Sequence, residues 1–292
     1  MAKIQIIKKQ IDLIKQIQHV TRAMKTISAV RWRTGKKILE NAQNFSNHLL
    51  RLNEIVYLHY QKELIAPHPS CGFAIIGIFS DKGLVGGFNT ILFQKIKIFI
   101  KDQEREGNKP HLIILGTQGI NQFKKSPYEI LLTHSLPVHQ SPNYQDVREI
   151  LYIIRKFHEQ RAFSHLYIAH NQYLSVSEYR PVIQRVIPIP LQGINLPPET
   201  QMDLRLKTDI LSTISPLAER LTFEYVASQL YTFLIESFLS EQSTRLKIMD
   251  SATSHSEDMI NSLRIAFQKG RQEKITQELN EVISASQVLG TI

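Results

Sequence analysis

The stretch of this sequence whose residue types come nearest to a chemical site is "SDKGLVGGFN" at residues 80–89. It follows an apolar segment typical of a strand and precedes a segment typical of a helix, as phosphate-binding loops do. Its glycines match neither G-x-G-x-x-G nor G-x-x-x-x-G-K-[ST], and Lys82 precedes them instead of closing the loop. We therefore interpret the stretch as a tight turn in which glycine supplies positive φ.

Other catalytic and metal-binding patterns are missing from the sequence. Its eleven histidines form no H-E-x-x-H or cysteine–histidine pattern typical of metal sites. The chain has one cysteine and no G-x-S-x-G elbow for a nucleophilic serine. The carboxylates of the middle segment form no evident acid–base pair. From the residues alone we expect no catalytic site, no metal ion and no cofactor.

The distribution of proline along the chain indicates which elements flank the turn. All twelve prolines fall between Pro67 and Pro216, so both ends of the chain lack the residue that breaks helices. These ends predict two very long helices. In the first, isoleucines repeat at helical spacing and then shift by three residues, a slip that locally overwinds a coiled coil. The two parts of this expected seam are Ile4, Ile7, Ile11 and Ile14, and then Ile17, Val20, Met24 and Ile27.

The C-terminal arm carries a second seam, in which spacings of three and four residues alternate throughout. Three polar residues and a glycine dilute it, so we expect a coiled coil that is not maximally apolar. We also expect this arm to pack on the first one, to be the longer of the two and to extend past the N-terminus. Its seam is Leu239, Gln242, Leu246, Met249, Thr253, Ser256, Ile260, Leu263, Phe267 and Gly270.

The middle of the chain alternates short apolar strands with helices, which predicts a small α/β domain with a largely parallel sheet. Expected strands are "GFAIIGIFS", "HLIILG", "YEILLTH", "SHLYIAHN" and "RPVIQRVIPIP", and "LQGINLPPETQ" reads as the linker to the second arm. The expected division is a helical arm at 1–66, an α/β domain at 67–203 and a helical arm at 204–292.

Charge is concentrated in the first arm. Residues 1–40 hold ten basic and two acidic residues, which is +8 of the net +9, whereas residues 217–292 hold seven basic and ten acidic residues. The two arms can attract each other, and the surplus positive charge favours an acidic partner. The basic residues alternate with a regular apolar seam, so we expect neither nucleic-acid binding nor insertion into a membrane.

Three segments together resemble the gamma subunit of F-type ATP synthases. They are "IKQIQHVTRAMKTISAVRWRTGKKILENA" near the start, "SDKGLVGGFNT" after the first strand, and "QSTRLKIMDSATSHSEDMINSLRIAFQKGRQEKITQELNEVISA" near the end. Their order and spacing match over nearly the whole chain. The resemblance implies an α/β fold class: a long antiparallel coiled coil of the N- and C-terminal helices plus a small Rossmann-like α/β domain.

The function implied by this resemblance is that of a non-catalytic rotor in the central stalk, coupling ion flow through the membrane ring to ATP synthesis or hydrolysis. Its implied partners are the alpha and beta subunits of the catalytic hexamer, the epsilon subunit and the c-type ring. The implied location is the cytoplasmic face of the bacterial inner membrane. The implied rotor–hexamer contacts are Met24, Lys25, Arg245, Gln272, Thr276 and Glu278, and the family turn is Gly83, Gly86, Gly87 and Asn89.

The sequence departs from the family pattern at a few places. Val85 stands where the family turn usually has cysteine, and "MDLRLKTDIL" lacks an acidic–proline pair common near the foot of the stalk. Two other functions stay open on the residues alone. One is a nucleotide-binding α/β enzyme built on the middle segment, and the other is a coiled-coil adaptor that uses its basic arm.

Overall fold

The computed structural model describes residues 2–59, 72–124, 126–136, 141–160, 162–189 and 211–289. The chain forms two compact units. We call Met1–Ser28 with Leu246–Ile292 the coiled-coil unit, and Ala29–Arg245 the sheet unit. Each unit is described by itself.

Two long helices and five strands make up most of the described chain, which confirms the expected fold class. The five strands fall where the sequence predicts them and alternate with helices as expected, and α3 is a short helix of seven residues. In chain order the elements are α1 (Ala2–His59), β1 (Gly72–Ile78), α2 (Phe88–Arg105), β2 (Pro110–Leu115), α3 (Thr117–Phe123), β3 (Glu129–His134), α4 (Tyr144–Glu159), β4 (Phe163–Tyr173), β5 (Tyr179–Ile187) and α6 (Leu211–Leu289).

In the coiled-coil unit, the start of α1 and the end of α6 pack antiparallel. Thr21 Oγ1 lies 2.9 Å from Thr253 Oγ1. Further toward the start of α1, a Cβ added at Gly270 would lie 3.6 Å from Ile4. The mutual packing of the two arms is therefore confirmed. Because α6 continues from Gly270 to Leu289, its extension past the N-terminus is also confirmed.

The expected slip in the α1 seam is wrong. Ile17, Val20 and Ile27 are 47, 59 and 50% exposed, whereas Thr21 and Ser28 are buried. The heptad thus continues without interruption, and small polar residues occupy its inner positions. Those positions accept them because the partner helix supplies matching groups, as Thr253 does for Thr21. The expected seam of α6 is confirmed, with Met249, Ser256 and Ile260 buried.

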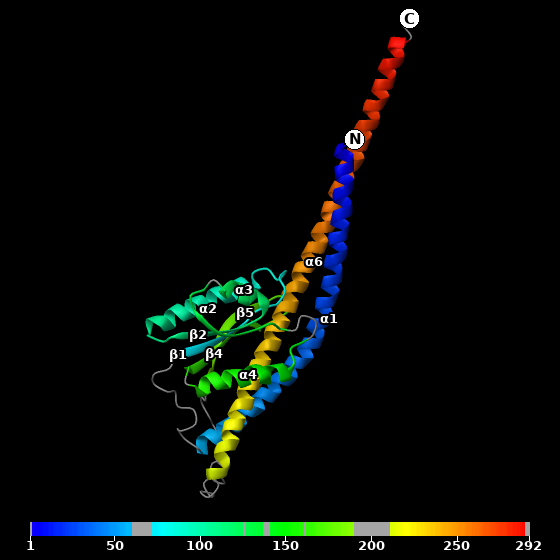
Figure 1. Ribbon diagram of the computed structural model, residues 1–292. Helices are drawn as coiled ribbons and strands as arrows, with labels where there is room; N and C mark the ends of the chain where they lie inside the picture. Colours follow the sequence, from blue (N-terminus) through cyan, green and yellow to red (C-terminus); the bar gives the residue numbers. More distant parts are fainter. Residues whose placement is uncertain are drawn as a thin grey trace. The chain divides into compact units, whose positions relative to one another are not determined.

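The sheet unit contains one sheet in the order β3-β2-β1-β4-β5. Strands β3, β2, β1 and β4 run parallel, and β5 pairs antiparallel with β4. The sheet is thus largely parallel, as expected. Figure 1 shows α2 and α3 on one side of these strands and α4 on the other.

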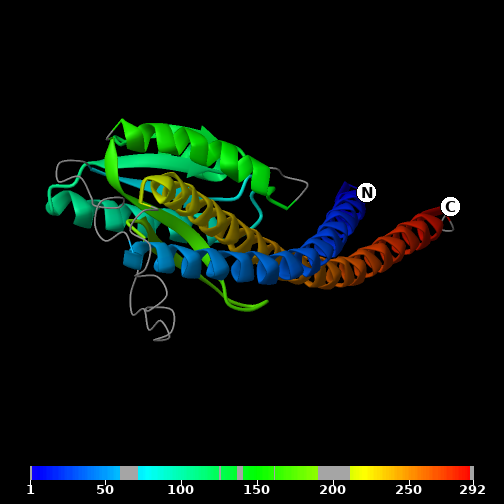
Figure 2. The ribbon, with the colours of Figure 1, turned by 90° about the horizontal axis from the view of Figure 1, so that it is seen from below.

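Each face of the sheet has its own apolar core, because successive side chains of a strand point to opposite faces. Phe73, Ile75, Leu112 and Ile114 pack with α2 and α3. Ala74, Ile76 and Ile113 pack with α4 and with the segments of α1 and α6 that belong to the sheet unit. Those two helix segments run side by side (Figure 2), and Ser228 Oγ of α6 lies 3.1 Å from Ser46 Oγ of α1.

Three expectations fall outside the described residues: the linker at 191–201 and the boundaries at 66/67 and 203/204. The division of the chain into 1–66, 67–203 and 204–292 stays a prediction. Among the helices that the structure describes, none combines the length and the apolar character needed to span a bilayer.

Candidate functional site: the glycine turn and helix α6

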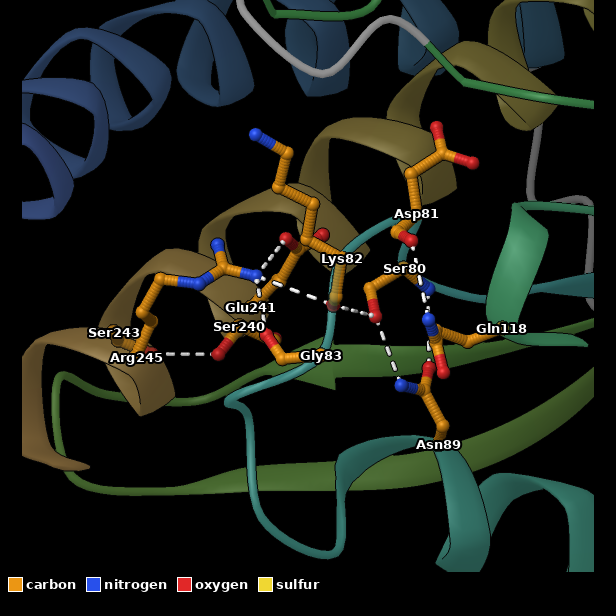
Figure 3. Close-up of polar contacts among 10 residues, drawn as sticks. All are labelled: Ser80, Asp81, Lys82, Gly83, Asn89, Gln118, Ser240, Glu241, Ser243 and Arg245. Atoms are coloured by element: carbon orange, nitrogen blue, oxygen red, sulfur yellow. Dashed lines mark hydrogen bonds and ion pairs between the residues drawn. The ribbon is translucent and has the colours of Figure 1, made fainter. Parts of the chain in front are cut away.

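The turn at residues 80–89 is closed by hydrogen bonds between its two ends. The Ser80 backbone N–H donates to Asn89 Oδ1 over 3.0 Å, and Asn89 Nδ2 donates to Ser80 Oγ over 2.8 Å. Both residues are buried. Asn89 of the family turn therefore ties the start of α2 to the end of β1 (Figure 3).

The acidic residue of the turn fastens it to the neighbouring strand–helix connection. Asp81 Oδ1 accepts hydrogen bonds from the Thr117 backbone N–H at 2.7 Å and from Thr117 Oγ1 at 2.5 Å. Gln118 adds two more, from its backbone N–H to the Ser80 carbonyl and from its side chain to the Asp81 carbonyl. The connections after β1 and after β2 thus form one hydrogen-bonded assembly.

Helix α6 reaches this assembly through Arg245. Its Nη2 lies 2.7 Å from Glu241 Oε1 and donates to the carbonyl oxygens of Lys82 at 3.4 Å and Gly83 at 3.3 Å (Figure 3). Arg245 is only 6% exposed. Burial raises the pKa of the Glu241 carboxyl, and the charge of Arg245 opposes that shift. Arg245 therefore pairs with a mostly buried carboxylate and also holds the turn in place.

This arrangement lies where an open α/β sheet usually binds its ligand, at the carboxyl ends of the strands beside the switch in strand order. The switch falls between β1 and β4. There, Ser240 Oγ of α6 donates to the Asn171 carbonyl over 3.0 Å, and Asn171 Nδ2 donates to the Phe88 carbonyl over 3.2 Å. The turn offers carbonyl oxygens to Arg245, whereas a phosphate needs N–H donors. Helix α6 thus lies at the edge of the sheet where folds of this kind usually bind a ligand.

The turn uses positive φ at two of its residues. Gly86 has φ 55° and Leu84 has φ 62°. Gly83 and Gly87 lie outside the left-handed region, and a Cβ at Gly83 would meet nothing within 4 Å. The interpretation as a tight turn that needs positive φ is therefore correct for Gly86, but one such position is filled by a leucine.

Two expected contact residues lie on the first helix of the coiled-coil unit. Lys25 Nζ lies 2.5 Å from Asp250 Oδ1, and the two side chains are 43% and 59% exposed. Met24, its neighbour, is partly buried. Lys25 thus has a partner within the chain, and its ammonium group remains accessible to solvent.

Gln272, Thr276 and Glu278 lie on the exposed final part of α6. Thr276 Oγ1 donates to the Gln272 carbonyl over 3.0 Å, and Lys274 Nζ pairs with Glu278 Oε1 at 3.1 Å. Asp250, the partner of Lys25, lies 22 residues before Gln272, which is about 33 Å along the helix at about 1.5 Å per residue. The structure therefore does not gather the expected contact residues into one cluster.

Two important residues of this region are missing from the sequence interpretation. Glu241 stands four residues before Arg245, a spacing that brings opposite charges together on a helix and could have revealed the pair. Asp81 gives no such signal, because its partner Thr117 belongs to another strand–helix connection.

Comparison with known proteins gives one consistent result. A sequence model of the ATP synthase family matches residues 3–289. The ATP synthase gamma chain of Acetivibrio thermocellus is 29% identical over 303 aligned positions, which cover 99% of this chain and 100% of that one. The gamma chain of Buchnera aphidicola subsp. Schlechtendalia chinensis is 28% identical, with 96% of each chain covered.

Solved structures show the same fold. A chain in the mitochondrial ATP synthase of Euglena gracilis, solved with OSCP, F1 and the c-ring, aligns with a TM-score of 0.67 at 13% identity, covering 99% of this chain and 95% of that one. A chain in the central stalk and c-ring of the Tetrahymena thermophila mitochondrial enzyme aligns with a TM-score of 0.56 at 20% identity, covering 80% and 99%.

Proposed function

The chain belongs to the ATP synthase family as a gamma chain, a central-stalk rotor subunit that is not itself catalytic, and from this premise we propose its partners and its working contacts. It turns inside a hexamer of alpha and beta subunits. At its other end it joins an epsilon subunit and a c-type ring. It thereby couples ion flow through the ring to ATP synthesis or hydrolysis, at the cytoplasmic face of a bacterial inner membrane.

The observation that carries this proposal is the full-length match to bacterial gamma chains. The antiparallel packing of α1 and α6 adds a physical argument, because a rotor shaft must resist twisting. Each helix stiffens the other along their shared seam. That seam is partly polar, as at Thr21 and Thr253. Both comparison structures come from assemblies that contain a c-ring, which supports the proposed place of this chain next to such a ring.

The proposed contacts with the hexamer lie in two zones. Met24 and Lys25 form one, and Gln272, Thr276 and Glu278 form the other. The exposed polar groups of the second zone suit contacts that form and break at each step, because a single hydrogen bond contributes only about 0.5–1.5 kcal/mol. We assign Arg245 an indirect role in these contacts. Its buried side chain does not touch the hexamer but holds the glycine turn in position.

Co-expression with the alpha, beta and epsilon subunits of a bacterial synthase tests this function. We expect the chain to co-purify with them in a complex that hydrolyses ATP. When the membrane sector with its c-type ring is also present, the complex should pump ions in membrane vesicles. The isolated chain should not bind ATP at micromolar concentration, because α6 lies at the edge of the sheet where folds of this kind usually bind a ligand. ATP binding by the isolated chain together with failure to co-purify would favour the enzyme instead.

Charge reversal at position 25 tests the first contact zone. Lys25→Glu should reduce ATP-driven ion pumping severalfold and should leave the fold intact, because an exposed ion pair contributes only about 0–1 kcal/mol to stability. The measurement is the initial pumping rate in vesicles, with assembly confirmed by co-purification.

A charge swap shows whether the effect of Lys25 on pumping comes from the hexamer or from Asp250. The double variant Lys25→Glu with Asp250→Lys restores an ion pair inside the chain and keeps the reversed charge at position 25. If Lys25 acts on the hexamer, this variant should pump as poorly as Lys25→Glu. Full recovery of pumping would show that the residue only pairs with Asp250.

A further inference from the structure

One polar cluster of the sheet unit has no part in the function described above. His170 of β4 is completely buried, and its Nε2 lies 2.9 Å from Glu236 Oε2 of α6. The other carboxylate oxygen of Glu236 accepts a hydrogen bond from Gln43 Nε2 of α1 over 3.1 Å. One buried carboxylate therefore joins a strand to both long helices, and we call these three residues the polar clamp.

The surroundings of the polar clamp are apolar. The ring of His170 stacks on Phe233 of α6 with centroids 4.3 Å apart and an interplanar angle of 16°. On β5, Val182 pairs with His170, and on β1, Gly77 pairs with the adjacent Ala169. Glu236 is the one charged group that acts on His170 within the described chain, since α1 contributes only the neutral Gln43.

The geometry fixes the role of each ring nitrogen. Nε2 faces a carboxylate oxygen, which only accepts hydrogen bonds, so Nε2 carries the proton and donates. Nδ1 is buried and has no hydrogen-bond partner among the described residues. A second proton at Nδ1 would create a buried donor with no acceptor among the described residues. It would also add a buried charge, and the Glu236 carboxylate offsets the cost of that burial only in part.

We propose that the polar clamp is an acid-sensitive attachment, which holds β4 to α1 and α6 while His170 is neutral and releases it when Nδ1 takes up a proton. In a rotor subunit, the firmness with which the sheet is joined to its two helices would then depend on the acidity around the chain. The neutral form holds the sheet, and the protonated form loosens it.

The direction of the effect follows from proton binding. Burial lowers the pKa of His170, and the opposing charge of Glu236 does not compensate for this. The folded chain therefore binds this proton less readily than the unfolded chain does. The stability that the neutral ring contributes is complete above about pH 6.5 and is lost as the pH falls through the lowered pKa, by up to about tenfold in the folding equilibrium per pH unit.

The chain contains its own reporter for the attachment. Its one tryptophan, Trp32 of α1, donates from Nε1 to Tyr173 Oη of β4 over 3.1 Å. Tyr173 lies on the same strand as His170, close to it in sequence. Loosening of β4 from α1 should therefore change the fluorescence of Trp32 without any label.

The experiment is a titration of the purified full chain from pH 8 down to the pH at which helix content is lost, followed by Trp32 emission and by far-ultraviolet circular dichroism. We expect the emission to change below about pH 6.5 with helix content retained. His170→Gln should abolish this change, because the glutamine amide can still donate to Glu236 but does not titrate. His165→Gln is the matched control: it makes the same substitution on the same strand, with a side chain on the opposite face, and should keep the transition.

A second variant keeps the test decisive if His170→Gln fails to fold. Glu236→Gln removes the charge that favours the protonated ring, so the transition should move to lower pH. Unchanged emission of the natural chain down to the pH at which helix content is lost would overturn the proposal. Loss of the transition in His165→Gln, or its persistence in a folded His170→Gln, would overturn it as well.

Discussion

Replacing Gly116 by alanine is expected to destabilise the chain severely. Gly116 joins β2 to α3 with φ 96°, and its N–H donates to the His134 carbonyl over 2.8 Å. A Cβ at this position would lie 2.1 Å from the Phe79 carbonyl oxygen, which is backbone and cannot move aside alone. The positive φ and the collision together should cost about 4 kcal/mol or more, a large share of the stability of an ordinary domain.

Two other glycines separate the causes of this loss. Gly107 has φ 86° with nothing within 4 Å of its added Cβ, so Gly107→Ala should lose only the backbone term of about 1–2 kcal/mol. Gly83 has neither constraint, so Gly83→Ala should stay within about 0.5 kcal/mol of the natural chain. Soluble yield and urea unfolding measure the series. Equal stability of the Gly116 and Gly107 variants would show that the backbone near Phe79 gives way.

The coiled coil shows what periodicity can and cannot predict. The absence of proline and the regular spacing were sufficient to place two long helices and the seam of α6. The sequence wrongly predicts a slip in the seam of α1, because Ile17 and Val20 are apolar whereas Gln18 and Thr21 are polar. Whether a seam position tolerates a hydroxyl depends on the partner helix, and Thr253 becomes its neighbour only in three dimensions.

The candidate site shows the same limit. Sequence spacing argued against a phosphate loop at residues 80–89 and indicated a tight turn, and the positive φ of Gly86 confirms the turn. From the sequence, Arg245 was expected to contact the hexamer. Its actual partners include the backbone carbonyls of Lys82 and Gly83, which lie far from it in the chain and carry no sequence signal. The short helix α3 escaped prediction because seven residues are too few to reveal a period.

Replacing Arg245 by alanine should destabilise the sheet unit by about 3 kcal/mol, near the lower end for a broken buried ion pair, because the Glu241 side chain is still 18% exposed. The variant leaves the Glu241 carboxylate without its partner and the carbonyls of Lys82 and Gly83 without a donor. Urea unfolding of the purified chain measures the loss. Arg264→Ala, which removes an exposed arginine from the same helix, should change stability by less than about 0.5 kcal/mol.

The pH dependence identifies the cause of that loss. Burial raises the pKa of Glu241, and without Arg245 nothing comparable opposes the shift. Below about pH 4.3 the carboxyl is protonated whether the chain is folded or unfolded, so the penalty is absent there and grows as the pH rises through the raised pKa. Arg245→Ala should therefore lose more stability at pH 8 than at pH 5, and adding Glu241→Ala should recover part of it. An equal loss at both pH values, with no recovery in the double variant, would mean that Arg245 stabilises the turn by packing and not by its charge.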